Sequence, residues 1–133
     1  MSPTKPPALL NPEFQGLTHD YREVVLKYLG FNMPNYVRFR GVMPSWDNTP
    51  RRQNHSQIFE HAHPGAYRAW LETVLDETHE QNFSEERVVF INAWNEWGEG
   101  NHLEPDKRYG HQFLEATRNA RDSWLLKCAE TRG

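Results

Sequence analysis

The run Val88-Val89-Phe90-Ile91 is apolar throughout and does not alternate with polar residues. A run of this kind is typical of a strand that is covered on both faces, as in a parallel sheet enclosed by helices. An earlier stretch, Tyr36 to Met43, is rich in aromatic and branched residues, stops at Pro44 and is too short for a helix. The sequence therefore predicts two strands, one at 36–43 and one within 88–93.

The segment between these strands has the periodicity of a helix that buries one face. Pro64 suits its first turn, and its apolar residues recur at helical spacing. They are Tyr67, Trp70, Leu71, Val74 and Leu75. A shorter pattern predicts a helix that is capped by Thr18 and ends in the left-handed conformation at Gly30. The spacing from Phe113 to Cys128 predicts a terminal helix, so the expected order is helix, strand, helix, strand, helix.

A strand, a crossover helix and a second strand predict two parallel strands. Parallel strands place their carboxyl ends at the same edge of the sheet. The loops at 44–52 and 94–105 are therefore expected to face each other, at the edge where α/β sheets bind ligands. The expected fold class is α/β, with the functional site in these two loops.

The second loop begins Trp94-Asn95-Glu96-Trp97-Gly98-Glu99-Gly100, which places two carboxylates, an amide and two indoles after a strand. Paired carboxylates supply the acid and base that glycosidic-bond cleavage requires. Residues three apart lie about 10 Å apart in a strand, but their Cβ atoms are about 5–6 Å apart in a helical turn. The glycines favour the turn, in which Glu96 and Glu99 share one substrate. The alternative is a surface turn with solvated glutamates and two core tryptophans.

The first loop reads Trp46-Asp47-Asn48-Thr49-Pro50-Arg51-Arg52. In the functional interpretation, Trp46 and Asp47 face the glutamates across the shared edge and bind a polar substrate. In the alternative, Asp-Asn-Thr-Pro forms an ordinary turn and the two arginines are a solvated corner. The residues alone leave both interpretations open.

Composition excludes several classes of function. The 133 residues are 37% hydrophobic and 25% charged, and no apolar run approaches the roughly 20 residues of a membrane span. The formal net charge of −3 provides no field for nucleic acid. His61 and His63 have no third ligand nearby, so neither a metal nor a cofactor is expected. Cys128 is the single cysteine, and Met1 to Pro7 lacks the apolar core of a secretion signal, so we expect a cytoplasmic protein.

Two separated motifs resemble a known family. The stretch Phe90 to Gly100, followed by Leu103-Glu104-Pro105-Asp106 and then Gly110 with Phe113-Leu114, resembles the C-terminal signature of the glycoside hydrolase family 99-like proteins. This group includes the WbsX-type proteins of bacterial polysaccharide and lipopolysaccharide O-antigen loci, usually labelled glycosyltransferases. The upstream Pro44 to Arg52 resembles the group's second signature, and the resemblance covers roughly residues 36–124.

The resemblance implies a (β/α)8 TIM barrel, a carbohydrate substrate and a site at the carboxyl ends of the strands. In the retaining endo-α-mannosidases of the group, the first Glu of the Glu-Trp-x-Glu motif is thought to act as base on the sugar 2-hydroxyl. The second is thought to act as general acid and then base. By motif these are Glu96 and Glu99, and Gly98 stands where those hydrolases commonly have His. The residues expected to bind the sugar are Trp46, Asp47, Asn48, Arg51, Trp94, Asn95, Trp97 and Glu104.

A barrel of this kind needs about 250 residues, so this chain is expected to be a C-terminal portion of one. Residues 1–16 are expected to form an extended, proline-rich lead-in. Residues 17–133 are expected to form the final β/α units with the preceding helix, which leaves the barrel incomplete. The chain is therefore expected either to need a partner chain that supplies the missing strands or to be a truncated gene product, and in isolation it should have little activity.

The expected function is that of an enzyme fragment acting on glycosidic bonds in bacterial polysaccharide or lipopolysaccharide metabolism. Its substrate would be an oligosaccharide or polysaccharide. One alternative is a glycosyltransferase of O-antigen biosynthesis, although no Asp-x-Asp and no Gly-rich phosphate loop after a strand occurs in the sequence. The other alternative is a non-catalytic sugar-binding or assembly module.

Overall fold

The computed structural model describes residues 11–131. Within that range the chain is a mixed α/β protein with small two-stranded sheets and no closed barrel. The strands are β1 (Leu17–Asp20), β2 (Arg40–Val42), β3 (Gln57–Glu60), β4 (Val89–Ile91), β5 (Asn95–Glu96) and β6 (Asn101–His102). The helices are α1 (Tyr21–Leu29), α2 (Thr49–Arg52), α3 (Pro64–Gln81) and α4 (Gln112–Glu130). Short 3-10 turns occur at Gln53–His55, Ser84–Glu86 and Trp97–Glu99.

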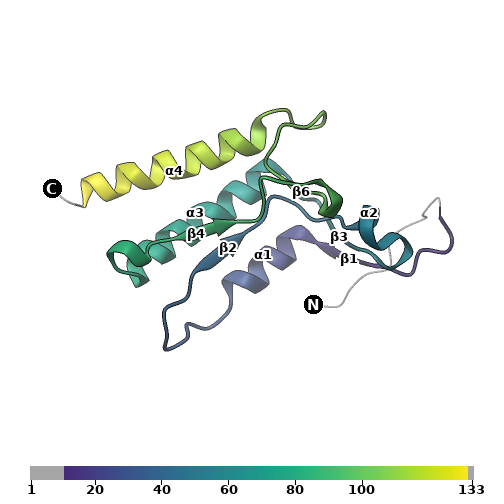
Figure 1. The fold of residues 1–133 in the computed structure, drawn as a ribbon. Helices are drawn as coiled ribbons and strands as arrows, with labels where there is room; N and C mark the ends of the chain where they lie inside the picture. The colour runs from purple at the N-terminus through teal and green to yellow at the C-terminus, as the bar shows by residue number, and fades with distance from the viewer. Residues whose placement is uncertain (1–10, 132–133) are drawn as a thin grey trace.

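The two strands predicted from the apolar runs pair in parallel, which confirms the expected topology. Arg40 lies opposite Val89, and Val42 lies opposite Ile91. The earlier strand is shorter than the predicted stretch 36–43, because β2 includes only three residues. Helix α3 connects the strands and covers one face of their sheet, and α4 packs against α3 (Figure 1).

The core lies between the helices and the covered face of this sheet. Tyr21 from α1, Tyr67 and Val74 from α3 and Ala120 from α4 are all fully enclosed. Val89 and Ile91 pack against this core from β4. The apolar face predicted for α3 is therefore the face that the structure buries.

The expectation that the apolar run is covered on both faces is wrong for the described residues. Phe90 lies between Val89 and Ile91, and its side chain is 61% exposed. Successive side chains of a strand point to opposite faces, so Phe90 points away from the helices. On that face the ring of Phe39 lies edge-on, with the two ring centroids 6.4 Å apart.

The predicted start of the first helix is wrong, whereas its end at Gly30 is right in position and wrong only in conformation. Thr18 lies in β1, and Asp20 caps α1 by accepting a hydrogen bond of 2.8 Å from the Arg22 amide. Gly30 has a φ of −80°, which is right-handed. The periodicity did not reveal that β1 pairs in parallel with β3, because both strands are short and half polar.

The lead-in predicted for residues 1–16 lies partly outside the described residues, because the description begins at residue 11. The part that is described contacts the rest of the chain. The Gln15 amide donates to the Asn54 carbonyl at 2.7 Å, and the side chains of Asn11 and Asn54 hydrogen-bond at 2.7 Å. Residues 11–16 are therefore fixed to the turn that follows α2.

Two buried tyrosines make the stability of the fold sensitive to alkali. Tyr21 donates to the Met43 carbonyl at 2.7 Å, and burial raises its pKa well above the usual value near 10. Burial also raises the pKa of Tyr67 to about 12, although the hydrogen bond with Thr117 opposes the shift. The folded state therefore keeps protons that the unfolded state releases above about pH 10.

The free energy of unfolding is therefore expected to fall as the pH rises from about 10 to 12, and these groups should cause no pH dependence below about pH 9. Tyr21→Phe should lose about 1 kcal/mol at neutral pH, because it removes one hydrogen bond. It should then show a shallower alkaline fall. Urea denaturation of both proteins across this pH range checks the prediction, and parallel curves would contradict it.

Candidate functional site

The two loops that follow β2 and β4 meet, as the parallel topology predicts. The Asp47 amide donates to the Glu99 carbonyl at 2.8 Å. The Ser45 hydroxyl donates to the Gly100 carbonyl at 2.6 Å. These two hydrogen bonds thus join the loop after β2 to the loop after β4.

Gly100 is what allows the loops to approach so closely. Its φ is +56°, in the left-handed region that favours glycine. A Cβ at this position would lie 2.8 Å from the Asp47 carbonyl oxygen and 2.9 Å from the Asp47 nitrogen. Backbone atoms cannot yield to such a contact as a flexible side chain can, so a larger residue would separate the two loops.

Glu96 and Glu99 share one guanidinium. Glu96 ends β5, and Glu99 closes the 3-10 turn Trp97–Glu99, so the turn predicted from the glycines is present. Arg51 of α2 donates from Nη2 to Oε2 of Glu96 at 2.8 Å and from Nη1 to Oε1 of Glu99 at 3.3 Å. The Glu96 side chain is 43% exposed and the Glu99 side chain 25%. Both carboxylates are therefore brought together and accessible to a ligand.

Gly98 provides the space that Arg51 occupies. A Cβ at Gly98 would lie 2.7 Å from Nε of Arg51. The absence of a side chain between the two glutamates thus lets the arginine lie across their turn. The sequence identified Gly98 as a departure from the hydrolase motif, but this packing requires the folded positions of α2 and the turn.

The indole of Trp97 is held from two sides. Its Nε1 donates to Oε2 of Glu104 at 2.6 Å, and the His102 ring stacks on it with centroids 3.5 Å apart and planes 16° apart. His102 in turn hydrogen-bonds the Glu104 carbonyl through Nδ1 at 3.0 Å. Glu104 therefore positions the indole, and His102 is a site residue that sequence reasoning missed.

The two tryptophans of this loop are not core residues. Trp94 is 53% exposed and Trp97 is 46% exposed. The alternative interpretation, solvated glutamates beside two core tryptophans, is therefore wrong about the tryptophans. Asn95 is likewise exposed, and its backbone pairs with His102 in the β5–β6 hairpin.

In the first loop, the side chains of Asp47 and Asn48 accept hydrogen bonds from nearby residues of the chain. Asp47 Oδ1 accepts from the amide of Thr49 at 2.9 Å and also from its hydroxyl. Asn48 Oδ1 accepts from the Gln57 amide at 2.7 Å. These are the bonds of a turn, as the structural alternative for this loop proposed. A sugar contact by either side chain stays a prediction.

Trp46 packs on Phe59, with ring centroids 6.4 Å apart. Its buried Nε1 has no hydrogen-bond acceptor among residues 11–131. Of the first-loop residues predicted to bind sugar, Arg51 is the one placed against the two glutamates.

The two neighbouring histidines have separate local roles. His63 caps α3 by accepting from the Ala66 amide at 3.2 Å, and Nδ1 of His61 lies 3.5 Å from an Asp20 oxygen. In the described part of the chain, no three His, Cys, Asp or Glu side chains form a group that could hold a metal ion. None of the helices within residues 11–131 has the length and apolarity needed to cross a bilayer.

Comparison with known proteins assigns the chain to a family. Residues 3–117 match the profile of the family described as Glycosyltransferase WbsX. The chain is 45% identical over 112 residues to the "Uncharacterized protein WxcX" of Xanthomonas campestris pv. campestris, in strain B100 and in strain ATCC 33913. The similar region covers 84% of this chain but 16% of each relative, so the chain spans a small part of their length. No solved structure matches the chain.

Proposed function

The chain belongs to the WbsX glycosyltransferase family, and we propose that it forms part of a carbohydrate-active enzyme that cleaves glycosidic bonds in bacterial polysaccharide or lipopolysaccharide metabolism. The observation that carries this proposal is the Glu96 and Glu99 pair on one guanidinium, beside two half-exposed indoles. Two carboxylates can divide the work of acid and base at one glycosidic bond. Half-exposed indoles offer flat apolar surfaces for sugar rings.

In this proposal Glu96 is the base that takes the proton of the attacking group, the sugar 2-hydroxyl. Glu99 donates a proton to the leaving oxygen as the 2-oxygen displaces it from the anomeric carbon. Water then attacks the same carbon and breaks its bond to the 2-oxygen, while Glu99 takes a proton from the water and Glu96 returns its proton to the 2-oxygen. Glu96 holds the shorter bond to Arg51, at 2.8 Å against 3.3 Å for Glu99. We propose that substrate entry moves Arg51 onto Glu96 alone, because a carboxylic acid can donate its proton only when it is released from the ion pair.

The substrate would lie against Trp94 and Trp97. The His102 ring covers one face of the Trp97 indole, and the hydrogen bond to Glu104 fixes the orientation of the ring. The remaining indole face is then held still for a sugar ring, which lowers the ordering cost of binding. Glu104 thus contributes by positioning Trp97.

We place β2, α3, β4 and α4 as two consecutive β/α units of a larger (β/α)8 barrel. The parallel pairing of β2 with β4 around α3 supports this placement, as does the site at their carboxyl ends. The matched region is 16% of each relative, so most of a complete barrel would come from elsewhere in a longer protein. The isolated chain is therefore proposed to be inactive.

The second candidate is transfer of sugar from a nucleotide donor, which the description of the family as glycosyltransferases favours. A chimera distinguishes the two reactions. In it, the 112 matching residues of this chain replace the corresponding segment of WxcX, and we call the result the completed protein. It is incubated with bacterial polysaccharides in the absence of sugar nucleotides. New reducing ends are expected. Turnover that requires a sugar nucleotide and releases a free nucleotide would contradict hydrolysis, and oligosaccharide binding without either reaction would favour a binding module.

A further inference from the structure

A pocket lies beside the junction of the two site loops. Its volume is about 600 Å³, within the roughly 300–1,000 Å³ of pockets that hold small ligands. Asp47 and Gly100 line it, and the same two residues meet where the Asp47 amide holds the Glu99 carbonyl. The pocket therefore lies next to the candidate site. We call it the β3 pocket, because the end of β3 and the residues that follow it form one wall.

Aromatic side chains give the β3 pocket flat apolar surface. Trp46 and Phe59 both line it, with their ring planes 37° apart. Tyr109 also lines it and is fixed from two sides. Its hydroxyl donates to the Ala62 carbonyl at 3.3 Å, and its ring lies edge-on to that of Phe113 with centroids 5.4 Å apart. Aromatic faces of this kind suit the apolar faces of sugar rings.

The polar groups of the β3 pocket include donors and acceptors that the fold leaves free. Among residues 11–131 the Glu60 carboxylate has no partner, and Asp47 accepts hydrogen bonds through Oδ1 alone. Arg108 forms no ion pair in that range, and its guanidinium carbon lies 5.0 Å from the centroid of the Tyr109 ring. Because His63 accepts through Nδ1, its neutral ring carries a proton on Nε2. A sugar hydroxyl both donates and accepts, so this mixture suits it.

The charge of the β3 pocket disfavours acidic sugars. Asp47, Glu60 and Asp106 each bring a carboxylate to the lining, whereas Arg108 is the single Lys or Arg among the described residues that line it. Histidine side chains are ordinarily neutral above about pH 7, so the carboxylates outnumber the cations there. The carboxylate of a uronic acid would therefore be repelled, whereas a sugar without an acidic group would not.

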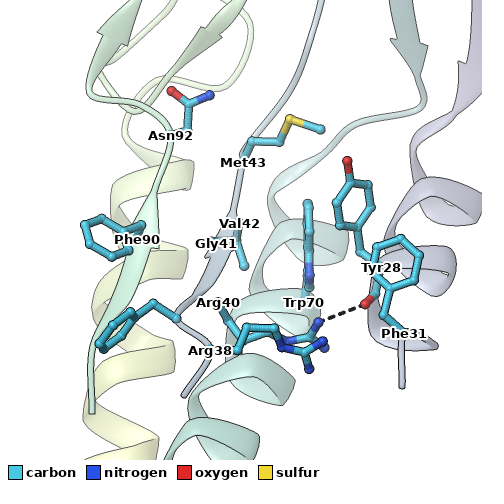
Figure 2. Close-up of a pocket in the computed structure, with 11 residues that line it drawn as sticks. Tyr28, Phe31, Arg38, Arg40, Gly41, Val42, Met43, Trp70, Phe90 and Asn92 are labelled. Carbon is cyan, nitrogen blue, oxygen red and sulfur yellow. Dashed lines mark hydrogen bonds between the residues drawn. The ribbon is translucent and has the colours of Figure 1, made fainter. Parts of the chain in front are cut away.

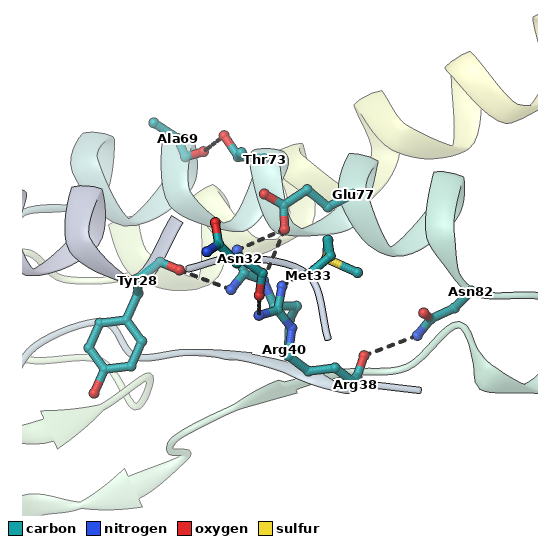
Figure 3. Close-up of polar contacts among 9 residues, drawn as sticks. All are labelled: Tyr28, Asn32, Met33, Arg38, Arg40, Ala69, Thr73, Glu77 and Asn82. Carbon is teal, nitrogen blue, oxygen red and sulfur yellow. Dashed lines mark hydrogen bonds and ion pairs between the residues drawn. The ribbon is translucent and has the colours of Figure 1, made fainter. Parts of the chain in front are cut away.

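The groove beside β2 has a different character. Figure 2 shows that mainly aromatic and aliphatic side chains surround it. Its two arginines are already engaged. Arg40 donates from Nε to Glu77 at 2.9 Å and from Nη1 to the Tyr28 carbonyl at 2.9 Å, and Arg38 donates to the Asn32 carbonyl at 3.3 Å (Figure 3). The β3 pocket is therefore the better match for a ligand rich in hydroxyl groups.

We propose that the β3 pocket binds a non-acidic sugar unit of the glycan, beside the bond that the two glutamates of the candidate site cleave. The inference rests on the proposed function for the class of ligand, since that function makes the ligand a glycan. The rings of Trp46 and Tyr109 contact the sugar ring. Arg108 donates to its hydroxyls, and Glu60 accepts from them.

Binding to the 133-residue chain tests the pocket without any need for turnover. The probes are two matched pairs of disaccharides, mannobiose with dimannuronic acid and galactobiose with digalacturonic acid, added at about pH 8. In an amide NMR titration, at least one neutral disaccharide should shift the signals of Ala62, Gly100 and Tyr109. It should bind with a Kd in the millimolar range, about tenfold more tightly than its acidic counterpart.

Variants locate the binding in the pocket. Arg108→Ala should weaken binding of the neutral disaccharide by about tenfold, whereas Arg118→Ala, at an exposed position of α4 outside the pocket, should not. Glu60→Gln keeps the shape of the side chain but removes its charge, so it should narrow the difference between neutral and acidic members. Thermal melts show that each variant is folded. No shift with either neutral disaccharide, equal or tighter binding of the acidic members, or full affinity in Arg108→Ala overturns the inference.

The completed protein distinguishes failure of this inference from failure of the proposed function. Arg108→Ala should raise the KM for the glycan by about tenfold with a much smaller change in kcat, because a contact away from the reacting bond stabilises ground state and transition state alike. An unchanged KM overturns the inference and leaves hydrolysis intact. Disaccharide binding in the pocket without any cleavage by the completed protein would contradict hydrolysis and support the pocket as a sugar-binding site.

Discussion

Glu96→Gln and Glu99→Gln are each expected to slow cleavage of the natural glycan by the completed protein by about 10²–10⁴-fold. The first change removes the base that activates the attacking group, and the second removes the proton donor for the leaving oxygen. Glutamine keeps nearly the same shape and can still accept a bond from Arg51, so the junction of the loops should persist. Initial rates at saturating glycan measure the effect.

A matched control is Glu85→Gln, which changes an exposed glutamate in a 3-10 turn that precedes β4. It should leave the rate unchanged. Near-wild-type rates in both site variants would show that the pair is structural. The sugar-binding module would then become the better account of the half-exposed indoles.

Gly100→Ala is expected to cause the largest loss of stability of any glycine-to-alanine change in the site loops. Its φ of +56° disfavours any L side chain, and the new Cβ would lie 2.8 Å from the Asp47 carbonyl oxygen. The conformational cost is about 1–2 kcal/mol, and forcing apart packed backbone adds about 1–3 kcal/mol. The bond between the Asp47 amide and the Glu99 carbonyl should break, so activity of the completed protein should fall as well.

Gly110→Ala separates the conformational cost of a left-handed φ from the cost of the steric contact. Gly110 has the same φ of +56°, but a Cβ there would meet nothing within 4 Å. It should therefore lose only the conformational part, about 1–2 kcal/mol, and keep its activity. Urea denaturation of both variants measures the difference. Equal losses would contradict the claim that Gly100 is needed for the close approach of the loops.

The sequence was sufficient for the elements whose apolar residues repeat regularly. The parallel pairing of β2 with β4 followed from one unbroken apolar run and the helix before it. The pairing of β1 with β3 was not predicted, because apolar and polar residues alternate too weakly in Leu17–Asp20 and Gln57–Glu60 to distinguish these strands from turns. Phe90 is an apolar residue of a type that is usually buried. In the described chain, however, no element covers the face of the β2–β4 sheet on which its side chain lies.

The sequence predicted which residues form the candidate site better than it predicted the contacts between them. The spacing of Glu96 and Glu99 indicated a shared turn, which the structure contains. The link to Arg51 depends on how α2 lies against that turn, and the His102 stack depends on a hairpin of two-residue strands. Neither arrangement has a signature in local spacing, because each joins segments through tertiary packing.

The most direct test of two-carboxylate chemistry is the dependence of the Glu99→Gln rate on the leaving group. An activated aryl glycoside leaves without a proton, so Glu99→Gln should be slowed strongly on the natural glycan and much less on the aryl substrate. Glu96→Gln should be slowed severely on both, because the attacking group must be activated whichever group leaves. Equal slowing of Glu99→Gln on the two substrates would contradict its role as the proton donor.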